Sequence, residues 1–248
     1  MAMAEPMTGK QDSCENPLAI HHFFSQDQFS RIEEIMYPRR VKAGSVIFWE
    51  GEPTGKLYYL RSGKVKLRKS TEDGKDFIFS VLQAGDLLCE PEDGLRKVHE
   101  FSAQVIEDAE LGVIQWKDLE ILLYRYGEFA VRFMNWMALM HRVTESKFRD
   151  LLLFGKPGAL ASTLIRLANS YGVACTDGIR ISLKLTNSEL AEMIGTTRES
   201  INRMLHGLQD EGTIEMRQGR IVILKLNELR KICQCPTCQA CPKEVCRI

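Results

Sequence analysis

Five of the chain's eight cysteines lie within its last sixteen residues, at Cys233, Cys235, Cys238, Cys241 and Cys246. A residue type used only for packing would be spread through the fold, so thiols gathered at one end indicate a metal site. The short gaps between these cysteines let one loop surround a single compact centre. Closely spaced cysteines beside a proline are typical of iron–sulfur proteins, whereas zinc ribbons use pairs that lie further apart. The tail therefore favours an iron–sulfur cluster over structural zinc or uncoordinated thiols.

The composition is that of an ordinary folded protein, with 44% hydrophobic and 27% charged residues in a chain of 248. This length predicts one or two domains. No apolar run is long enough to cross a membrane, and residues 1–20 lack the apolar core of a signal peptide, so we expect a cytoplasmic protein with no membrane partner. Clustered cysteines there bind metal more often than they form disulfides. Because the formal net charge is zero, any binding of nucleic acid must come from a local motif.

Residues 21–127 are expected to form a β-rich domain that follows a flexible N-terminus, residues 1–20. Short runs of β-forming residues are separated by glycines and charged turns, such as the hairpin signal Glu72-Asp73-Gly74-Lys75. Lys64-Val65-Lys66-Leu67 alternates polar and apolar side chains, which indicates a strand with one buried face. Many short strands at this spacing predict a small antiparallel barrel or jelly roll.

Residues 128–154 are predicted to form one long helix. Apolar side chains recur along it at alternating steps of four and three residues, at Phe129, Phe133, Trp136, Met140 and Val143. This spacing is that of a coiled-coil seam, so we favour a dimerisation helix, although a helix buried in its own core would show the same pattern. Asp150 falls near the extension of the seam, where a carboxylate is costly unless it is paired or bound to a metal. On spacing alone, a solvated or ion-paired Asp150 at a fraying helix end is the simpler interpretation.

Residues 155–231 contain a second strong signal, two short helices joined at Gly195 and followed by two short strands. This pattern predicts a winged helix-turn-helix, whose second helix enters the major groove of DNA. Four side chains near the start of that helix are expected to face outward, namely Arg198, Glu199, Asn202 and Arg203. Arginine can bond to both acceptors of guanine, and glutamate can accept from the cytosine amino group. We therefore predict sequence-specific binding to double-stranded DNA.

The glycine-punctuated β-strands, the long helix and the stretch from Thr197 to Leu205 together resemble the CRP/FNR family of bacterial transcription regulators, over about residues 20–230. The resemblance implies an α+β fold with an N-terminal antiparallel β-roll of the cyclic-nucleotide-binding type, a long dimerisation helix, a C-terminal winged helix-turn-helix and, here, a cysteine-rich tail, residues 232–248. It also implies a homodimer that binds an inverted repeat and contacts RNA polymerase, and it implies no enzyme. Cyclic-AMP binders carry an arginine where this chain has Phe101, so no cyclic nucleotide is expected.

Within the family, the tail is most like that of the bacillus type, which carries an oxygen-sensing [4Fe-4S] cluster, one per subunit. The Cys-x-x-Cys-x-x-x-x-Cys pattern of that type matches Cys238, Cys241 and Cys246. The resemblance implies an aspartate as the fourth ligand and places it at Asp150. From the residues alone, Cys235 would be the nearest remaining ligand.

These features predict an oxygen-sensing regulator of anaerobic gene expression that binds DNA as a homodimer while its cluster is intact. A cluster ligand from Asp150 would tie the tail to the long helix, and loss of the cluster would release this tie. As a lone carboxylate, Asp150 should cost little stability when removed. Arg198, Glu199 and Arg203 match the CRP-type reading set, and Asn202 replaces the FNR-type serine, so the half-site should resemble TGTGA and not TTGAT. The alternative is a CRP-type regulator with a structural zinc tail and an organic effector in the β-roll.

Overall fold

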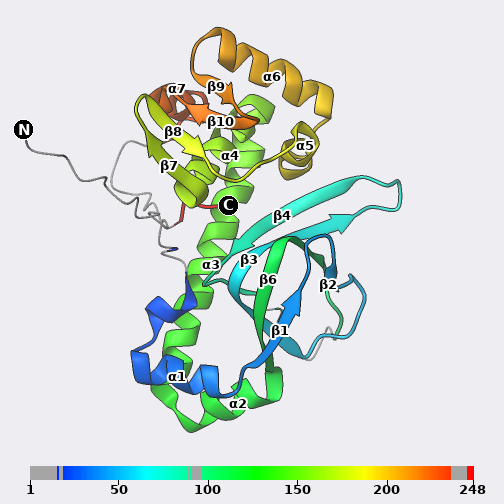
Figure 1. Cartoon of the computed structure of the whole chain (residues 1–248), viewed down its shortest axis with the longest axis vertical. Coiled ribbons are helices and arrows are strands. Elements are labelled where there is room, and N and C mark those ends of the chain that lie inside the picture. The colour runs from blue at the N-terminus through cyan, green and yellow to red at the C-terminus, as the bar shows by residue number, and fades with distance from the viewer. Residues whose placement is uncertain (1–15, 17–18, 89, 91–96, 236–244) are drawn as a thin grey trace, which may run out of the picture.

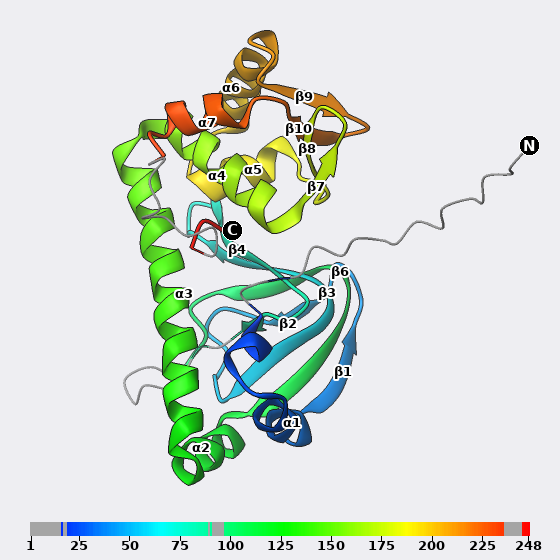
Figure 2. The same cartoon turned by 90° about the vertical axis from the view of Figure 1, so that its left-hand side faces the viewer.

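The computed structural model describes residues 16, 19–88, 90, 97–235 and 245–248, which form two domains joined by one long helix (Figures 1 and 2). Two of the predicted cysteine ligands, Cys238 and Cys241, lie outside these residues. Within the described part of the chain, no helix is both long enough and apolar enough to cross a membrane.

The N-terminal domain is the predicted antiparallel β-roll. Its sheet has the order β1-β6-β3-β4, with β2 paired to β6 and β5 paired to β3. The predicted hairpin joins β3 to β4 through a turn in which Gly74 has a φ of 78°. In chain order, the elements are the 3-10 helix η1 (Ile20–Phe23), α1 (Gln26–Glu34), β1 (Tyr37–Val41), β2 (Val46–Phe48), β3 (Lys56–Ser70), β4 (Asp76–Gln83), β5 (Leu87–Leu88), β6 (Ser102–Gln115) and α2 (Trp116–Arg125).

The long helix α3 (Gly127–Leu153) packs along the N-terminal domain with the very stripe that was expected to face a partner subunit. Phe129, Phe133 and Trp136 are buried in one core with side chains of η1, α1 and β6. The assignment of this stripe to a dimer contact is therefore wrong, and its spacing reflects burial against the chain's own domain. Helix α3 also exposes large apolar side chains, those of Val131, Met134, Phe148, Leu152 and Leu153. Four of them, Val131, Met134, Phe148 and Leu152, share another face of the helix, here called the outer stripe.

The C-terminal domain packs four helices against a small antiparallel sheet of order β7-β8-β10-β9, in which β9 and β10 are the predicted wing. Leu160, Leu164 and Leu167 of α4 are fully buried at its centre, as their helical spacing predicts. The elements are α4 (Gly155–Tyr171), β7 (Gly172–Cys175), β8 (Gly178–Ile181), α5 (Asn187–Ile194), α6 (Arg198–Asp210), β9 (Ile214–Arg217), β10 (Arg220–Ile223) and α7 (Leu226–Ile232).

The β3–β4 hairpin connects the two domains. Ile78 and Val81 of β4 are buried in the core of the C-terminal domain, although they belong to the β-roll. The Tyr171 hydroxyl donates a hydrogen bond of 2.9 Å to the carbonyl of Val81, and the Lys66 ammonium pairs with the Glu189 carboxylate at 3.2 Å. The hairpin therefore contacts the start of the helix-turn-helix directly.

Candidate functional site

The helix-turn-helix consists of α5 and α6, which meet at Gly195. Thr186 caps α5 by accepting a hydrogen bond from the backbone N–H of Glu189, whose side chain accepts from the Thr186 backbone in return. Gly195 ends α5 in the left-handed conformation, with a φ of 64°, where a residue without a side chain is favoured. Thr197 caps α6 by accepting from the third residue of the helix. These local signals are why the sequence folds into two short helices here.

Helix α6 buries one face and exposes the other. Its buried side chains are those of Ile201, Leu205 and Leu208. Arg198, Glu199 and Arg203 are exposed on the opposite side, as predicted. Asn202 is half-buried, and its side-chain oxygen accepts a hydrogen bond from Asn187 on α5. Asn202 thus also links the two helices, a role that its place in the sequence did not indicate.

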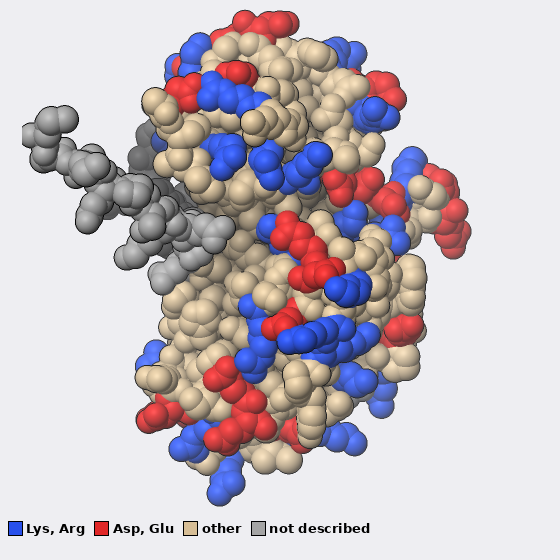
Figure 3. All heavy atoms as spheres, in the orientation of Figure 1, with Lys and Arg blue, Asp and Glu red and all other residues tan. Residues whose placement is uncertain are grey.

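The surface around the helix-turn-helix carries charges of both signs. Figure 3 shows acidic and basic side chains interspersed over the visible face of both domains, in keeping with a formal net charge of zero. Attraction to phosphates without regard to sequence is therefore a weak driving force. Helix α6 lies at the outer end of the C-terminal domain, opposite the end that carries α1 and α2 (Figure 1). The exposed polar face of α6 is therefore the surface that the sequence analysis predicts to contact DNA.

The second candidate site is centred on Asp150, at the C-terminal end of α3, which is only 6% exposed. Its Oδ2 accepts hydrogen bonds of 2.5 Å from both the Ser162 hydroxyl and the Arg166 guanidinium, two side chains of α4. Its Oδ1 accepts from Nε and Nη2 of the adjacent Arg149, at 3.0 and 2.8 Å. The interpretation of Asp150 as a solvated side chain is therefore wrong. The interpretation of Asp150 as an ion-paired side chain is confirmed.

The charge of Asp150 is stabilised by these contacts. Burial by itself would raise the pKa of the carboxyl, but the hydrogen bonds from Ser162 and Arg166 and the charge of Arg166 outweigh it and lower the pKa below its usual value. The expectation that Asp150 is a lone carboxylate, cheap to remove, is wrong. Its loss would leave the buried guanidinium of Arg166 without a counter-ion.

Arg166 joins three parts of the chain at this point. Its guanidinium, 2% exposed, donates to the Ser146 hydroxyl on α3 at 2.8 Å as well as to Asp150. It also donates to the backbone carbonyls of Val245 and Arg247 in the tail, at 3.2 and 3.3 Å. Protein groups therefore connect the tail, α3 and α4 in this structure, and the predicted tie through a cluster ligand at Asp150 stays a prediction.

Sequence reasoning missed Arg166, although a signal was present. Arg166 is the one charged residue in the stretch between Lys156 and Asp177. A single arginine within an apolar helix is costly unless a buried anion pairs with it. That argument would have indicated a carboxylate partner, for which Asp150 was a candidate.

Cysteine thiols lie beside Asp150. A cavity of about 10 Å³ is lined by Cys233, Cys235 and Cys246 together with Arg149, Asp150, Ser162, Ile165 and Arg166. The tail is held against α4 here, because Asn169 donates a hydrogen bond of 2.7 Å to the carbonyl of Cys246 and Ser170 accepts one of 3.1 Å from the N–H of Ile248. The structure thus brings together two predicted ligands, Asp150 and Cys246, and the alternative ligand Cys235.

The donors around this cavity have the chemistry of an iron site, with soft thiols beside one hard carboxylate. As the described residues are arranged, no three His, Cys, Asp or Glu side chains among them could hold a metal ion. A cavity of about 10 Å³ has room for about one water molecule. The residues therefore fit an iron–sulfur cluster in kind, and holding one would require the tail to open.

Cys233 differs from the other two thiols. Burial and the adjacent Cys235 raise the pKa of the Cys233 thiol to about 11, and its Sγ lies 3.7 Å from the carbonyl oxygen of Arg230. In this arrangement Cys233 is therefore held as a neutral thiol.

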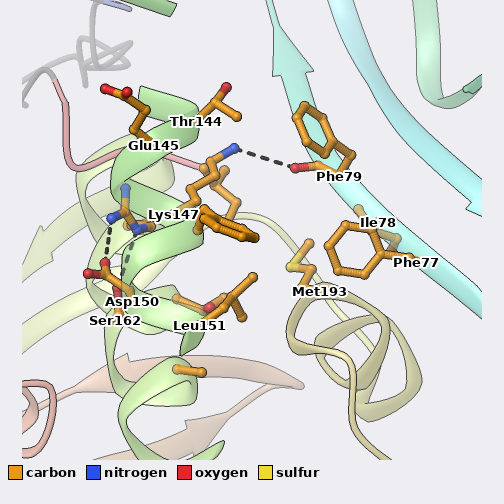
Figure 4. A pocket seen from close by; sticks show the side chains of 15 residues that line it. Phe77, Ile78, Phe79, Thr144, Glu145, Lys147, Asp150, Leu151, Ser162 and Met193 are labelled. Carbon is orange, nitrogen blue, oxygen red and sulfur yellow. Dashed lines mark hydrogen bonds and ion pairs between the residues drawn. The ribbon is translucent and has the colours of Figure 1, made fainter. Parts of the chain in front are cut away.

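A larger cavity of about 450 Å³ lies between β4, α3 and the C-terminal domain (Figure 4). Phe77, Phe79 and Met193 contribute apolar walls, and Lys147 reaches across from α3 toward β4. The Lys147 ammonium lies 3.5 Å from the carbonyl oxygen of Phe79, its one hydrogen bond described here. Burial, and then the nearby positive charge of Arg166, lower the pKa of Lys147 to about 7.

The described residues near Phe101 and Glu90 of the β-roll contact other protein groups. The ring of Phe101 packs against that of Phe79, with centroids 4.8 Å apart. The Glu90 carboxylate is engaged by the ring of His99 at 3.0 Å and by the backbone N–H of Glu100 at 3.1 Å. A cavity enclosed by apolar side chains of the roll measures about 10 Å³, room for about one water molecule.

Comparison with known proteins finds a matching family for each of the two domains. Residues 38–126 match the family model of the cyclic nucleotide-binding domain, and residues 158–232 match that of the Crp-like helix-turn-helix domain. The chain is 41% identical over 226 residues to the "Anaerobic regulatory protein" of Bacillus subtilis, a match that covers 90% of this chain and 94% of that protein. It is 26% identical over 198 residues to the "CRP-like cAMP-activated global transcriptional regulator" of Mycobacterium tuberculosis, covering 80% and 86%.

A solved structure of another protein has the same fold. FixK2 from Bradyrhizobium japonicum matches with a TM-score of 0.70 at 19% identity, covering 80% of this chain and 97% of that one. The two domain matches, their order along the chain and the extensive identity to the Bacillus protein lead to one conclusion. This chain belongs to the CRP/FNR family of DNA-binding transcription regulators.

Proposed function

We propose that the chain is an oxygen-responsive regulator that binds DNA as a homodimer while each subunit carries one [4Fe-4S] cluster. The observation that carries this proposal is the convergence of Asp150, Cys235 and Cys246 at the joint of α3, α4 and the tail. A metal centre at this joint would act on the element that positions the DNA-binding domain. The similarity to a protein named as an anaerobic regulator supports the same function.

The proposed ligands are the thiolates of Cys238, Cys241 and Cys246 and the carboxylate of Asp150. When bound, such a cluster supplies iron that reacts with oxygen, and a hard carboxylate among soft thiolates leaves one iron more open to attack. Cys235 lines the same cavity and remains the alternative to Asp150.

The chain's own contacts give this site a connection to DNA. Arg166 and Asn169 hold the tail on α4 through three backbone carbonyls. Helix α4 in turn packs against α3 and against α5 of the helix-turn-helix. A change in how the tail sits on α4 is therefore expected to change the position of α5 and α6 relative to α3.

The exposed side chains of α6 support reading of a TGTGA-type half-site. Arg198 and Arg203 would each bond to guanine, and Glu199 would accept from cytosine. A symmetric dimer requires two inverted half-sites about 10 bp apart, centre to centre. RNA polymerase is the expected partner at promoters.

The outer stripe of α3 supports the homodimer. Val131, Met134, Phe148 and Leu152 are all more than half exposed in one subunit. Exposed apolar side chains that gather on one face of a helix, here as one pair near each end of α3, are typical of a contact surface. Two copies of α3 packed along this stripe would place two α6 helices at the same end of the dimer.

Two points argue against one part of the rival function, an organic effector in the β-roll. By the family resemblance, Phe101 stands where cyclic-AMP binders carry an arginine, and the cavity described inside the roll measures about 10 Å³. We therefore propose that the β-roll binds no cyclic nucleotide and serves as a scaffold for α3 and the β3–β4 hairpin.

Anaerobic purification tests the proposal. The protein should be brown, should contain iron and sulfide in equal amounts, and should bind a TGTGA palindrome in a fluorescence anisotropy assay. Air should bleach the colour and weaken binding. Cys241→Ala should abolish the colour, whereas Cys175→Ala, a change at an exposed cysteine on β7, should not. A colourless zinc protein that binds DNA equally well in air would refute the proposed function.

A further inference from the structure

The side chain of Asn202 on α6 is held by the helix that precedes it. Asn202 follows Arg198 by four residues and Glu199 by three, so it lies beside both on the surface of α6. Its Oδ1 accepts a hydrogen bond from Nδ2 of Asn187, the first residue of α5. Among the described residues, this is the one hydrogen bond that the Asn202 side chain makes.

An amide that is held by its oxygen has its nitrogen left for another partner. The Nδ2 of Asn202 carries two hydrogens, so it can donate a hydrogen bond but cannot accept one. This nitrogen is open to solvent, since it is not one of the buried polar atoms without a partner in the described part of the chain. An asparagine without such a contact can turn its amide and offer either group, whereas Asn187 fixes Asn202 in one orientation.

The major groove of DNA distinguishes bases by donors and acceptors of this kind. Guanine and thymine present the oxygens O6 and O4, whereas adenine and cytosine present amino groups at N6 and N4. Each base pair joins one base of the first kind to one of the second. Reversing a base pair therefore replaces an acceptor with a donor, and a side chain that can only donate distinguishes the two orientations.

We propose that Asn187 is a positioning residue for specificity, which holds Oδ1 of Asn202 so that its Nδ2 donates to O6 of guanine or O4 of thymine. The inference rests on the proposed function, since it concerns the reading of a half-site by α6. Pairing of asparagine with adenine through two hydrogen bonds needs a donor and an acceptor on the same amide. Asn202 does not offer both, because its oxygen faces α5.

Asn187→Asp is the decisive change. A carboxylate only accepts hydrogen bonds, so it repels Oδ1 of Asn202 and should turn the amide until Nδ2 donates to it. Asn202 would then present its oxygen to DNA, an acceptor suited to the amino groups of adenine and cytosine. Because an acidic residue in the first turn of a helix is favourable, the variant should fold. Ser188→Asp is the matched control, since it adds the same charge one residue later, and the side-chain hydrogen bond described between α5 and α6 comes from Asn187.

The experiment uses the full chain, purified anaerobically, in fluorescence anisotropy titrations. The DNA is the TGTGA palindrome and five versions of it, each with one base pair reversed in both half-sites. The ratio of two dissociation constants is compared for each protein, because a charge that acts on all DNA alike cancels from it. Asn202→Ala identifies the base pair that Asn202 contacts, as the one whose reversal no longer matters.

At that base pair, wild type and Ser188→Asp should favour the original orientation by about two- to tenfold, the range for one neutral hydrogen bond. In Asn187→Asp the preference should shift toward the reversed orientation by a similar factor. An Asn187→Asp protein with the wild-type preference would overturn the inference, because Asn202 would then donate to Asn187 and present its oxygen to DNA. An Asn202→Ala protein that still discriminates at all five base pairs would also overturn it.

Thermal melting monitors the fold of each variant. If Asn187→Asp does not fold, Asn202→Asp decides, because one carboxylate oxygen can keep the hydrogen bond from Asn187 while the other presents an acceptor to DNA. The same shift is expected there, and an unchanged preference would again overturn the inference. A wild type that binds the palindrome no better than DNA of scrambled sequence would refute the proposed function itself. A specific wild type with unchanged variants would refute only this inference.

Discussion

Asp150→Ala should destabilise the metal-free protein strongly, because Asp150 and Arg166 form a buried ion pair. The two side chains lie 2.5 Å apart, and less than a tenth of each is exposed. Alanine in place of Asp150 removes the counter-ion but leaves the guanidinium where it is. A buried charge has lost its hydration, and without its partner no ion pair compensates for that loss.

The size of the effect follows from the contacts that Arg166 keeps. Breaking a buried ion pair by removing one partner costs about 3–5 kcal/mol. Arg166 retains the hydroxyls of Ser146 and Ser162 and two tail carbonyls as acceptors. We therefore expect the lower end of the range, about 3 kcal/mol. The contact with Arg149 adds less than about 1 kcal/mol, since that side chain is half exposed to solvent.

Urea unfolding of the metal-free protein, followed by circular dichroism, measures this loss. Asp150→Asn should cost less than Asp150→Ala, because an amide oxygen can still accept from Ser162. Glu110→Ala, which breaks the exposed pair with Arg40, should change the midpoint little. Adding Arg166→Met to Asp150→Ala should recover part of the loss, since the unpaired charge is gone. A loss below about 0.5 kcal/mol in Asp150→Ala would refute the reasoning, because exposed pairs contribute that much.

Three further outcomes are expected. Lys147 has a folded-state pKa of about 7 against an ordinary 10.5, so between these values the folded chain binds fewer protons than the unfolded chain, and the urea midpoint should rise from pH 7 to pH 9. Asp86, with a pKa of about 6, is already ionised over this range. Lys147→Met should therefore reduce the change of the urea midpoint with pH. A falling wild-type midpoint would contradict this. Arg198→Ala should weaken binding to a TGTGA palindrome by about 1–3 kcal/mol in anisotropy titrations, and equal competition by TTGAT would exclude the predicted reading set. Leu152→Glu should yield monomers in analytical ultracentrifugation while Ile121→Glu, at an exposed site on α2, should not; a dimeric Leu152→Glu would remove the outer stripe as the contact.

The helix-turn-helix was predictable because its signals are local. Thr186, Gly195 and Thr197 act within a few residues of themselves, through caps and one left-handed backbone conformation. The spacing of apolar residues in α3 was equally clear but did not identify their partner. A 3.5-residue repeat reports that one face is buried, and the face of Phe129 and Trp136 is buried against the chain's own β-roll.

The candidate metal site could be predicted only in part, because its decisive contacts join distant segments. The cysteine spacing indicates the tail, and the resemblance indicates Asp150, but among its neighbours in the sequence only the adjacent Arg149 contributes to its surroundings through the hydrogen bonds described. Its partner Arg166 follows sixteen residues later on another helix, and the carbonyls of Val245 and Arg247 come from the far end of the chain. Such contacts depend on how α3 and α4 pack, which periodicity does not determine.

Because Arg166 and Asn169 already hold the tail on α4, a cluster can control DNA binding only if it favours a different arrangement of the same segments. A bound group shifts an equilibrium by no more than its difference in affinity for the two arrangements. The donors surround a cavity of about 10 Å³, so binding should require the tail to give up some of its contacts with α4. Those contacts then oppose loading.

Asn169→Ala tests this step. It removes the hydrogen bond of 2.7 Å to the carbonyl of Cys246 but changes no proposed ligand. Loss of one such bond is worth about 1 kcal/mol, so anaerobic assembly of the chromophore should become about fivefold easier at equal iron and sulfide, and tail amides in the metal-free protein should exchange faster with deuterium. Asn135→Ala, at an exposed position of α3, should change neither. Slower assembly in Asn169→Ala would mean that the docked tail helps to bind the cluster. The cluster would then have to change DNA binding while the tail stays on α4.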